Sequence, residues 1–339
     1  MSTSPTRRRV PLPEISSRAW EHPADRGALV ALRKLKGFDT VLKALSGLVN
    51  ERAVRLELLG SAIRADERQF QAMYHQLADV AAVLDATEVP ELFVRADPTF
   101  AAVTIGMDKP VIVVNSALVD LLDADEMAFV LGHELGHALS GHAVYQTLVR
   151  RLLVLSGVLG SVPLGGLGFR LIVAALMEWS RKAELSADRA GLLATQDPAV
   201  AFRAHMKLAS GGHLEDLDTT SFFDQGREYD EAGDLRDSVL KMLLVETRTH
   251  PFAVVRAAEL RRWVDSGDYT AILGGTYPRR SDDADAPLSD AARQAARSYS
   301  ETFEQTQNTL GRLAHDAAGL LGSVKGWLDE NLFRQRPES

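Results

Sequence analysis

Residues 133–137 read HELGH, and they carry the most information in this chain. They lie in a stretch, residues 124–142, that predicts a helix, because Asp123 and Glu126 have the spacing of a capping box just before an apolar run. Two histidines four positions apart on a helix lie on one face, about 40° apart around the axis. Their imidazoles can therefore bind one metal ion together.

The chemistry predicted for this helix is that of a zinc hydrolase. His133 and His137 would bind the ion, and Glu134 would reach a water on the ion without being a ligand, about 100° from His133 around the axis. Zinc lowers the pKa of such a water toward about 7, and the carboxylate takes its proton as the water attacks a carbonyl. The apolar residues around the motif predict a buried helix, in which these polar side chains need a cation as partner.

A catalytic zinc ion also needs a third protein ligand, for which the sequence offers two candidates. His142 would point about 140° away from His137 on a continuing helix, so we expect an exposed or capping histidine there. Glu184 and Asp188 share a face of another predicted helix, among small residues that favour close packing. An exposed charged helix is the alternative for this segment. We predict that Glu184 is the third ligand and that Asp188 accepts a hydrogen bond from the outer nitrogen of His133.

These segments resemble the gluzincin metallopeptidases related to HtpX-type heat-shock proteases and CAAX prenyl endopeptidases. The resemblance covers about residues 75–265, and its matching stretches are Val111–Leu118, Asp125–His137, Trp179–Asp188 and Thr249–Pro251 with Arg256. It implies a zinc endopeptidase with a strand at the edge of the cleft that pairs with extended substrate, and an aspartate behind a zinc ligand at position 188. It also implies that His250 and Arg256 stabilise the oxyanion, whereas a cap residue and a surface charge are the alternatives for these two residues.

The remaining sequence predicts an α+β fold that is mostly α-helical. We expect a zincin-like metallopeptidase core with a small antiparallel sheet of about three strands beside the HExxH helix. The strands are predicted from β-prone runs at 91–95 and 111–114 with a third run between them. Residues 98–102 depart from the pattern of the related enzymes, which leaves the substrate contact at that place unassigned.

Four regions are expected along the chain. They are a disordered tail over 1–27, a zinc metallopeptidase domain over 28–275, a linker over 276–290 and a C-terminal amphipathic helical segment over 291–339. The C-terminal helix would fold back on the domain or mediate docking or self-association.

Residues 152–178, between the two zinc segments, are apolar or small almost throughout. A single membrane span is excluded by topology, because His137 and Glu184 must reach one ion and the chain must therefore cross a bilayer an even number of times. Two crossings need about 40 apolar residues, more than this stretch contains. We expect a buried hairpin, with a lid over the cleft or contact with a membrane surface as alternatives.

Composition excludes several classes of function. The 339 residues include no cysteine, which excludes disulfides, thiolate zinc sites and cysteine nucleophiles. The formal net charge of −8 argues against nucleic-acid binding. Arginines at 7–9 are followed by prolines and polar residues instead of an apolar run, so no secretion signal is expected. A cytoplasmic protein is predicted, with a location at the membrane periphery as the alternative.

The predicted function is a zinc-dependent endopeptidase that acts on protein or peptide substrates, with Glu134 as general base. An aminopeptidase on the same scaffold is one alternative. The other is a non-proteolytic, chaperone-like or scaffold module that binds zinc for structure. Glu134 argues against this module, because a structural zinc site has four protein ligands and needs no base.

Overall fold

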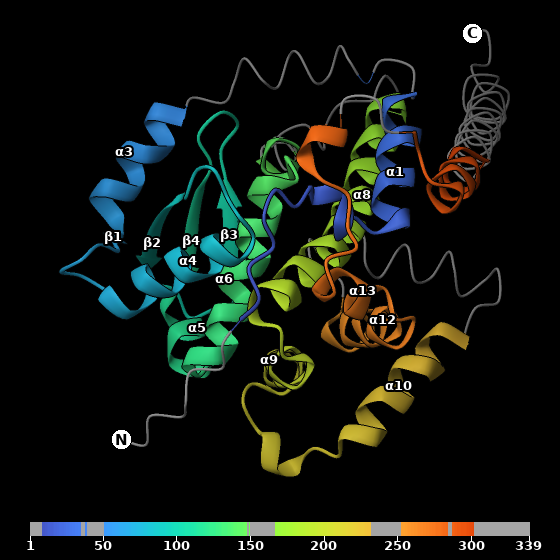
Figure 1. Cartoon of the computed structure of the whole chain (residues 1–339). Coiled ribbons are helices and arrows are strands. Elements are labelled where there is room, and N and C mark those ends of the chain that lie inside the picture. The colour runs from blue at the N-terminus through green and yellow to red at the C-terminus, as the bar shows by residue number, and fades with distance from the viewer. Residues whose placement is uncertain are drawn as a thin grey trace, which may run out of the picture.

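The computed structural model describes residues 9–34, 38, 51–147, 149, 167–231, 252–283 and 287–301. Two long helices, α6 (Ala124–Leu139) and α8 (Leu167–Thr195), pack against each other at the centre (Figure 1). The sheet lies on one side of this pair with α4 (Gln71–Val83), and α1 (Pro23–Arg33) packs along α8 on the other. The fold is α+β and mostly helical, as predicted.

The remaining helices surround this centre. They include α3 (Glu51–Ser61), α5 (Ser116–Leu121), α9 (Pro198–Ser210), α10 (Thr219–Glu231), α12 (Ala253–Asp265) and α13 (Asp268–Leu273), with short 3-10 turns at Ser17–Ala19, Leu214–Asp216 and Arg280–Asp282. The main core lies between the sheet, α4, α6, α8, α9 and α12, and its residues are almost completely buried.

The sheet has four strands, in the order β1 (Ile63–Arg64), β2 (Glu91–Arg95), β4 (Val111–Asn115) and β3 (Ala102–Ile105). It is mixed, because β2 pairs with β4 in parallel while the other two pairs are antiparallel. The predicted antiparallel arrangement of about three strands is wrong in this respect. After β2 the chain passes to the edge of the described sheet and forms β3, and β4 then lies between β3 and β2. The apolar pattern of a strand does not indicate which strands become its neighbours. All five residues of β4 are buried, as expected for a central strand.

The capping box predicted at the start of α6 is present. Asp123 accepts a hydrogen bond from the Glu126 backbone at 2.9 Å, and the Glu126 carboxylate accepts one from the Asp123 backbone at 3.0 Å. Glu126 is fully buried, and Lys207 of α9 lies 2.6 Å from its carboxylate. This ion pair compensates for the burial of the charge and ties α9 to the first turn of α6.

Small residues let α6 and α8 approach closely. A Cβ atom added to Gly132 would lie 2.6 Å from the Cβ of Ala194, and one added to Gly191 would lie 2.7 Å from the backbone oxygen of Phe129. These distances are too short for any side chain. The two helices therefore touch through their backbones, which brings the two predicted zinc segments together.

The N-terminal residues form part of the core, so the predicted disordered tail is corrected for residues 9–27. Ile15 and Trp20 are 2% and 1% exposed. The side-chain amide of Gln196, at the end of α8, exchanges two hydrogen bonds with the backbone of Val10 at 2.8 and 2.7 Å. The polar, proline-containing composition predicted disorder, but the few apolar residues of this segment are the ones that pack. Residues 1–8 lie outside the described part.

The predicted linker over 276–290 is docked for most of its described length. The backbone nitrogen of Ser16 donates to Pro278 at 3.0 Å, and that of Arg280 donates to Glu14 at 2.9 Å. Residues 290–301 are helical and lie against α1, where a Cβ at Gly27 would meet Ala295 at 2.5 Å. This contact agrees with a C-terminal segment that folds back on the domain, whereas residues 302–339 lie outside the described part.

The apolar segment 152–178 is only partly described. Residues 167–178 form the first turns of α8, and residues 152–166 lie outside the described part, so the predicted hairpin stays a prediction. No helix in the described ranges combines the length and apolar character needed to cross a bilayer.

Replacing Gly191 with alanine tests the close crossing. Gly191→Ala should lower the free energy of unfolding by about 1–3 kcal/mol, because the new methyl group would overlap the backbone of α6. The measurement is urea unfolding followed by circular dichroism.

The matched control is Gly60→Ala on α3, where a Cβ would meet nothing within 4 Å. This change should be neutral or raise stability by up to about 1 kcal/mol, because alanine favours the helix. Equal losses in the two variants would contradict the close approach of α6 and α8.

Candidate metal centre

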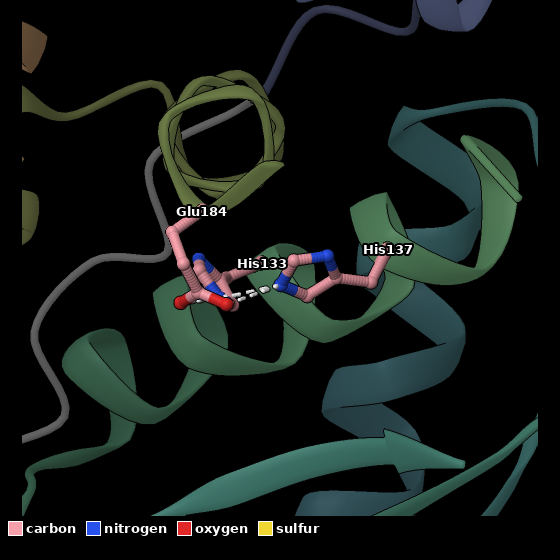
Figure 2. Close-up of side chains that lie close together, drawn as sticks. All are labelled: His133, His137 and Glu184. Carbon is pink, nitrogen blue, oxygen red and sulfur yellow. Dashed lines mark hydrogen bonds and ion pairs between the residues drawn. The ribbon is translucent and has the colours of Figure 1, made fainter. Parts of the chain in front are cut away.

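The structure brings His133, His137 and Glu184 together at the crossing of α6 and α8 (Figure 2). The Nε2 atoms of the two histidines are 3.1 Å apart. The carboxylate oxygens of Glu184 lie 3.4 Å from Nε2 of His133 and 3.3 Å from Nε2 of His137. These three residues form a metal-binding triad, and all three side chains are buried.

The donor set of this triad suits zinc. Two imidazole nitrogens and one carboxylate form a usual three-ligand set of catalytic zinc sites, which leaves a fourth position for a water or substrate. Burial lowers the pKa of His137 to about 3, which keeps it neutral, as a metal ligand must be. Burial would also lower the pKa of His133, but hydrogen bonds to Asp188 and Glu184 raise it to about 9. The carboxylates of Asp188 and Glu184 thus favour a positive charge beside them. That charge can be a proton on His133 or a divalent metal ion bound to it.

Asp188 and Arg256 lie directly behind the triad. Asp188 Oδ1 is 2.9 Å from Nδ1 of His133, the outer nitrogen, as predicted. Arg256 donates from Nε to the other oxygen of Asp188 at 2.7 Å, and its NH1 lies 3.3 Å from Glu184. Burial would raise the pKa of Asp188, but Arg256 and the neighbouring histidines keep it well below its usual range. These contacts favour the ionised form of Asp188, which can accept a hydrogen bond from Nδ1 of His133.

Glu134 lies beside His133 on the wall of a cleft of about 970 Å³. Its carboxylate Oε2 is 2.7 Å from the hydroxyl of Thr104, which also lies 2.9 Å from the Glu134 backbone oxygen. Thr104 belongs to β3 and is fully buried. Thr104 was not predicted as a site residue, and its only signal in the sequence is a hydroxyl in an otherwise apolar strand.

The cleft runs between the border of the sheet and the helices that follow α8. Its lining includes Phe100 and Ala102 on the β3 side and Tyr229, Phe252 and Arg256 on the side of α10 and α12. The structure thus places Arg256 both behind the triad and at the cleft wall, while the oxyanion role predicted for it stays a prediction. His250 lies outside the described residues.

His142 is buried, so the prediction of an exposed or capping histidine is wrong. α6 ends at Leu139, and Gly141 has a φ of 70°, which lets the chain turn before a new helical stretch at 142–147. The angle expected for a continuing helix therefore does not apply. The Nδ1 atom of His142 lies 3.1 Å from Nδ1 of His137. His142 is not part of the triad, in agreement with its rejection as a ligand.

Two further buried residues were not predicted. Gln146, on the same helical stretch as His142, donates from Nε2 to Glu184 Oε1 at 3.3 Å. His205 of α9 is fully buried, its Nε2 lies 3.6 Å from Asp188 Oδ1, and burial lowers its pKa to about 4. Both residues come near the triad through tertiary packing, and no motif marks them.

Comparison with known proteins agrees with this geometry. The model of peptidase family M48 matches residues 64–264, which is more than half of the chain. The plastoglobule-localized metallopeptidase 48 of Arabidopsis thaliana is 34% identical over 262 residues, which cover 75% of this chain and 74% of the relative. Protease HtpX of Xanthomonas oryzae pv. oryzae is 24% identical over 272 residues, which cover 71% of this chain and 88% of that protease. No solved structure gives a significant match.

The matched region contains α6, α8 and all but the last residue of α12, and these helices carry the triad, Glu134, Asp188 and Arg256. The resemblance to HtpX-type proteases is thereby confirmed. The chain belongs to peptidase family M48 and is a zinc metallopeptidase, a hydrolase.

Proposed function

We propose that this metallopeptidase is an endopeptidase that cleaves internal peptide bonds of protein or peptide substrates. The arrangement that carries the proposal is a three-ligand site with a carboxylate beside it that is not a ligand. His133, His137 and Glu184 would hold the ion, whereas Glu134, which lines the cleft, lies 2.7 Å from the buried hydroxyl of Thr104. A structural zinc site would have four protein ligands and no use for such a base.

Zinc held by the triad would polarise the scissile carbonyl and make a water more acidic. Glu134 accepts the proton of the attacking water and passes it to the leaving amine. The Thr104 hydroxyl fixes the direction of the Glu134 carboxylate, because it lies within hydrogen-bond distance of both the carboxylate and the backbone of the same residue. Asp188 holds His133 in the orientation and tautomer that a ligand needs.

The shape of the cleft favours extended substrates. β3 is the border strand of the described sheet, and residues 100–102 at its start line the cleft. An extended peptide that adds to such a border would place successive side chains alternately toward and away from the enzyme. Phe100, Leu118 and Phe252 offer apolar contacts there, so we infer a substrate with apolar side chains near the cleaved bond.

An aminopeptidase is the second candidate, and Glu228 is the observation that favours it. Apart from Glu134, it is the acidic side chain among the described residues of the cleft lining. An acid in this place could bind the free amine of a substrate. Cleavage of N-acetylated peptides distinguishes the two activities, because an aminopeptidase needs the free amine and an endopeptidase does not.

Location and assembly rest on the sequence alone. We propose a cytoplasmic protein, for which the absence of cysteine is the support. The alternative location is the membrane periphery, with contact through the apolar segment 152–178. For assembly, the apolar pattern of 291–339 supports self-association. The Arabidopsis relative is plastoglobule-localized by its name.

Replacing Glu134 with glutamine should separate metal binding from catalysis. Glu134→Gln keeps the side-chain shape but removes the base, so cleavage of an N-acetylated peptide should fall by about 10²- to 10⁴-fold. Zinc content, measured by metal analysis of the same preparation, should stay at the wild-type level.

Glu57→Gln on the exposed face of α3 is the control for loss of a carboxylate, and it should change neither quantity. Undiminished cleavage by Glu134→Gln would contradict the proposed mechanism. A wild-type chain that binds zinc and cleaves no peptide would favour the non-proteolytic module.

Thr104→Val tests the support of the base. It removes the hydroxyl at nearly constant volume, and the loss of a hydrogen bond to a charged group corresponds to a fall in kcat of about 10- to 100-fold. KM should change little, because Thr104 is buried behind Glu134. Thr104→Ser keeps the hydroxyl and should restore most of the rate, and equal rates for the two variants would exclude the positioning role.

A further inference from the structure

The two histidines of the triad both have a polar partner at the outer nitrogen, but the partners differ. His133 contacts Asp188 directly, at 2.9 Å. His137 contacts His142, whose far nitrogen, Nε2, lies 3.1 Å from the carboxylate of Asp25. Asp25 lies on α1, outside the residues 64–264 that the family model matches.

The connection from His137 to Asp25 is buried along its whole length. Asp25 is 1% exposed, and His142 is 4% exposed. The Ser186 hydroxyl of α8 donates to the same carboxylate oxygen of Asp25 at 2.6 Å, and the ring of Trp179 packs edge-on against His142. Burial would raise the pKa of Asp25, but the nearby His142 and the hydrogen bonds from His142 and Ser186 lower this pKa below its usual value. A buried, ionised carboxylate is costly unless it is well paired, so Asp25 must be compensated by this network.

The contacts allow one consistent placement of protons. If Nε2 of His137 binds an ion, its Nδ1 carries the hydrogen and donates it to Nδ1 of His142. His142 then carries its own hydrogen on Nε2 and donates it to Asp25. Gln146 also lies 3.3 Å from Nδ1 of His137, but its amide nitrogen is a donor and cannot accept this hydrogen. In this arrangement Asp25 favours the tautomer of His142 whose Nδ1 can accept the hydrogen of His137.

We propose that Asp25, acting through His142, positions His137 for metal binding, so that the N-terminal helix α1 completes the metal centre. The inference rests on the proposed zinc site and extends it to a residue of another element. Asp25 and His142 are positioning residues, because neither is a member of the triad. Partners at this distance from the ion increase ligand basicity and fix the orientation of the ring.

Zinc affinity of the full chain tests the proposal. The probe is zinc alone, in competition with a chromophoric chelator at constant pH. Asp25→Asn and His142→Phe should each weaken binding by about 10- to 100-fold, because partners behind metal ligands contribute by such factors. Circular dichroism of the zinc-free proteins shows whether each variant is folded.

The double variant distinguishes positioning from a general effect on the fold. Asp25 acts only through His142, so Asp25→Asn should have no further effect on zinc affinity in the His142→Phe background. Additive losses would overturn the proposal, because they would mean that the two residues act independently.

Glu21→Gln is the matched control. Glu21 lies just before α1 and pairs with Arg26 at 3.5 Å, so the variant removes a negative charge near Asp25 but no bond to His142. It should keep the wild-type zinc affinity, and a loss as large as that of Asp25→Asn would overturn the proposal.

The two proposals fail in different ways. A wild-type chain that binds no zinc would overturn the proposed function itself. Wild-type affinity in either Asp25→Asn or His142→Phe would overturn only the role of Asp25. If Asp25→Asn does not fold, His142→Phe decides alone, because it leaves the Asp25–Ser186 hydrogen bond of α1 in place.

Discussion

The close crossing of α6 and α8 is the constraint on which the rest of this structure depends. Gly132 and Gly191 stand where any side chain would overlap the other helix. Because the backbones touch, a glutamate on α8 reaches the Nε2 atoms of two histidines on α6. A separation larger by one side chain would leave Glu184 beyond the reach of an ion held by α6.

This crossing also concentrates buried charge. Glu134 of α6 and Glu184 and Asp188 of α8 are all buried near this crossing, where Arg256 pairs with Asp188 and approaches Glu184. Buried carboxylates are costly unless positive charge or hydrogen bonds compensate for them. A divalent ion at the triad would add its positive charge to that of Arg256. The fold and the metal are therefore coupled, since the packing that creates the site also creates the need for the ion.

The parts of the site that could be predicted from the sequence are those set by helical spacing. The histidines of α6 and the Glu184–Asp188 pair of α8 lie four residues apart, and a helix turns such a spacing into a shared face. Thr104 and Asp25 could not be predicted, because each meets the site only through the tertiary fold. His142 was misplaced because Gly141 ends the helix, and the order of the strands was missed because apolar patterns do not specify which strands become neighbours.

The position of Asp25 also gives the N-terminal segment a thermodynamic link to the metal. Asp25 and Ser186 join α1 to α8, while His142 joins Asp25 to His137. Coupling free energies are reciprocal. If Asp25 strengthens zinc binding, bound zinc stabilises the docked position of α1 by the same free energy. Residues 290–301 pack on α1 at Gly27, so the start of the C-terminal segment rests on the same helix. A change that displaces α1 would therefore weaken the metal site without touching a ligand, and loss of the metal would loosen the contact between the two terminal segments.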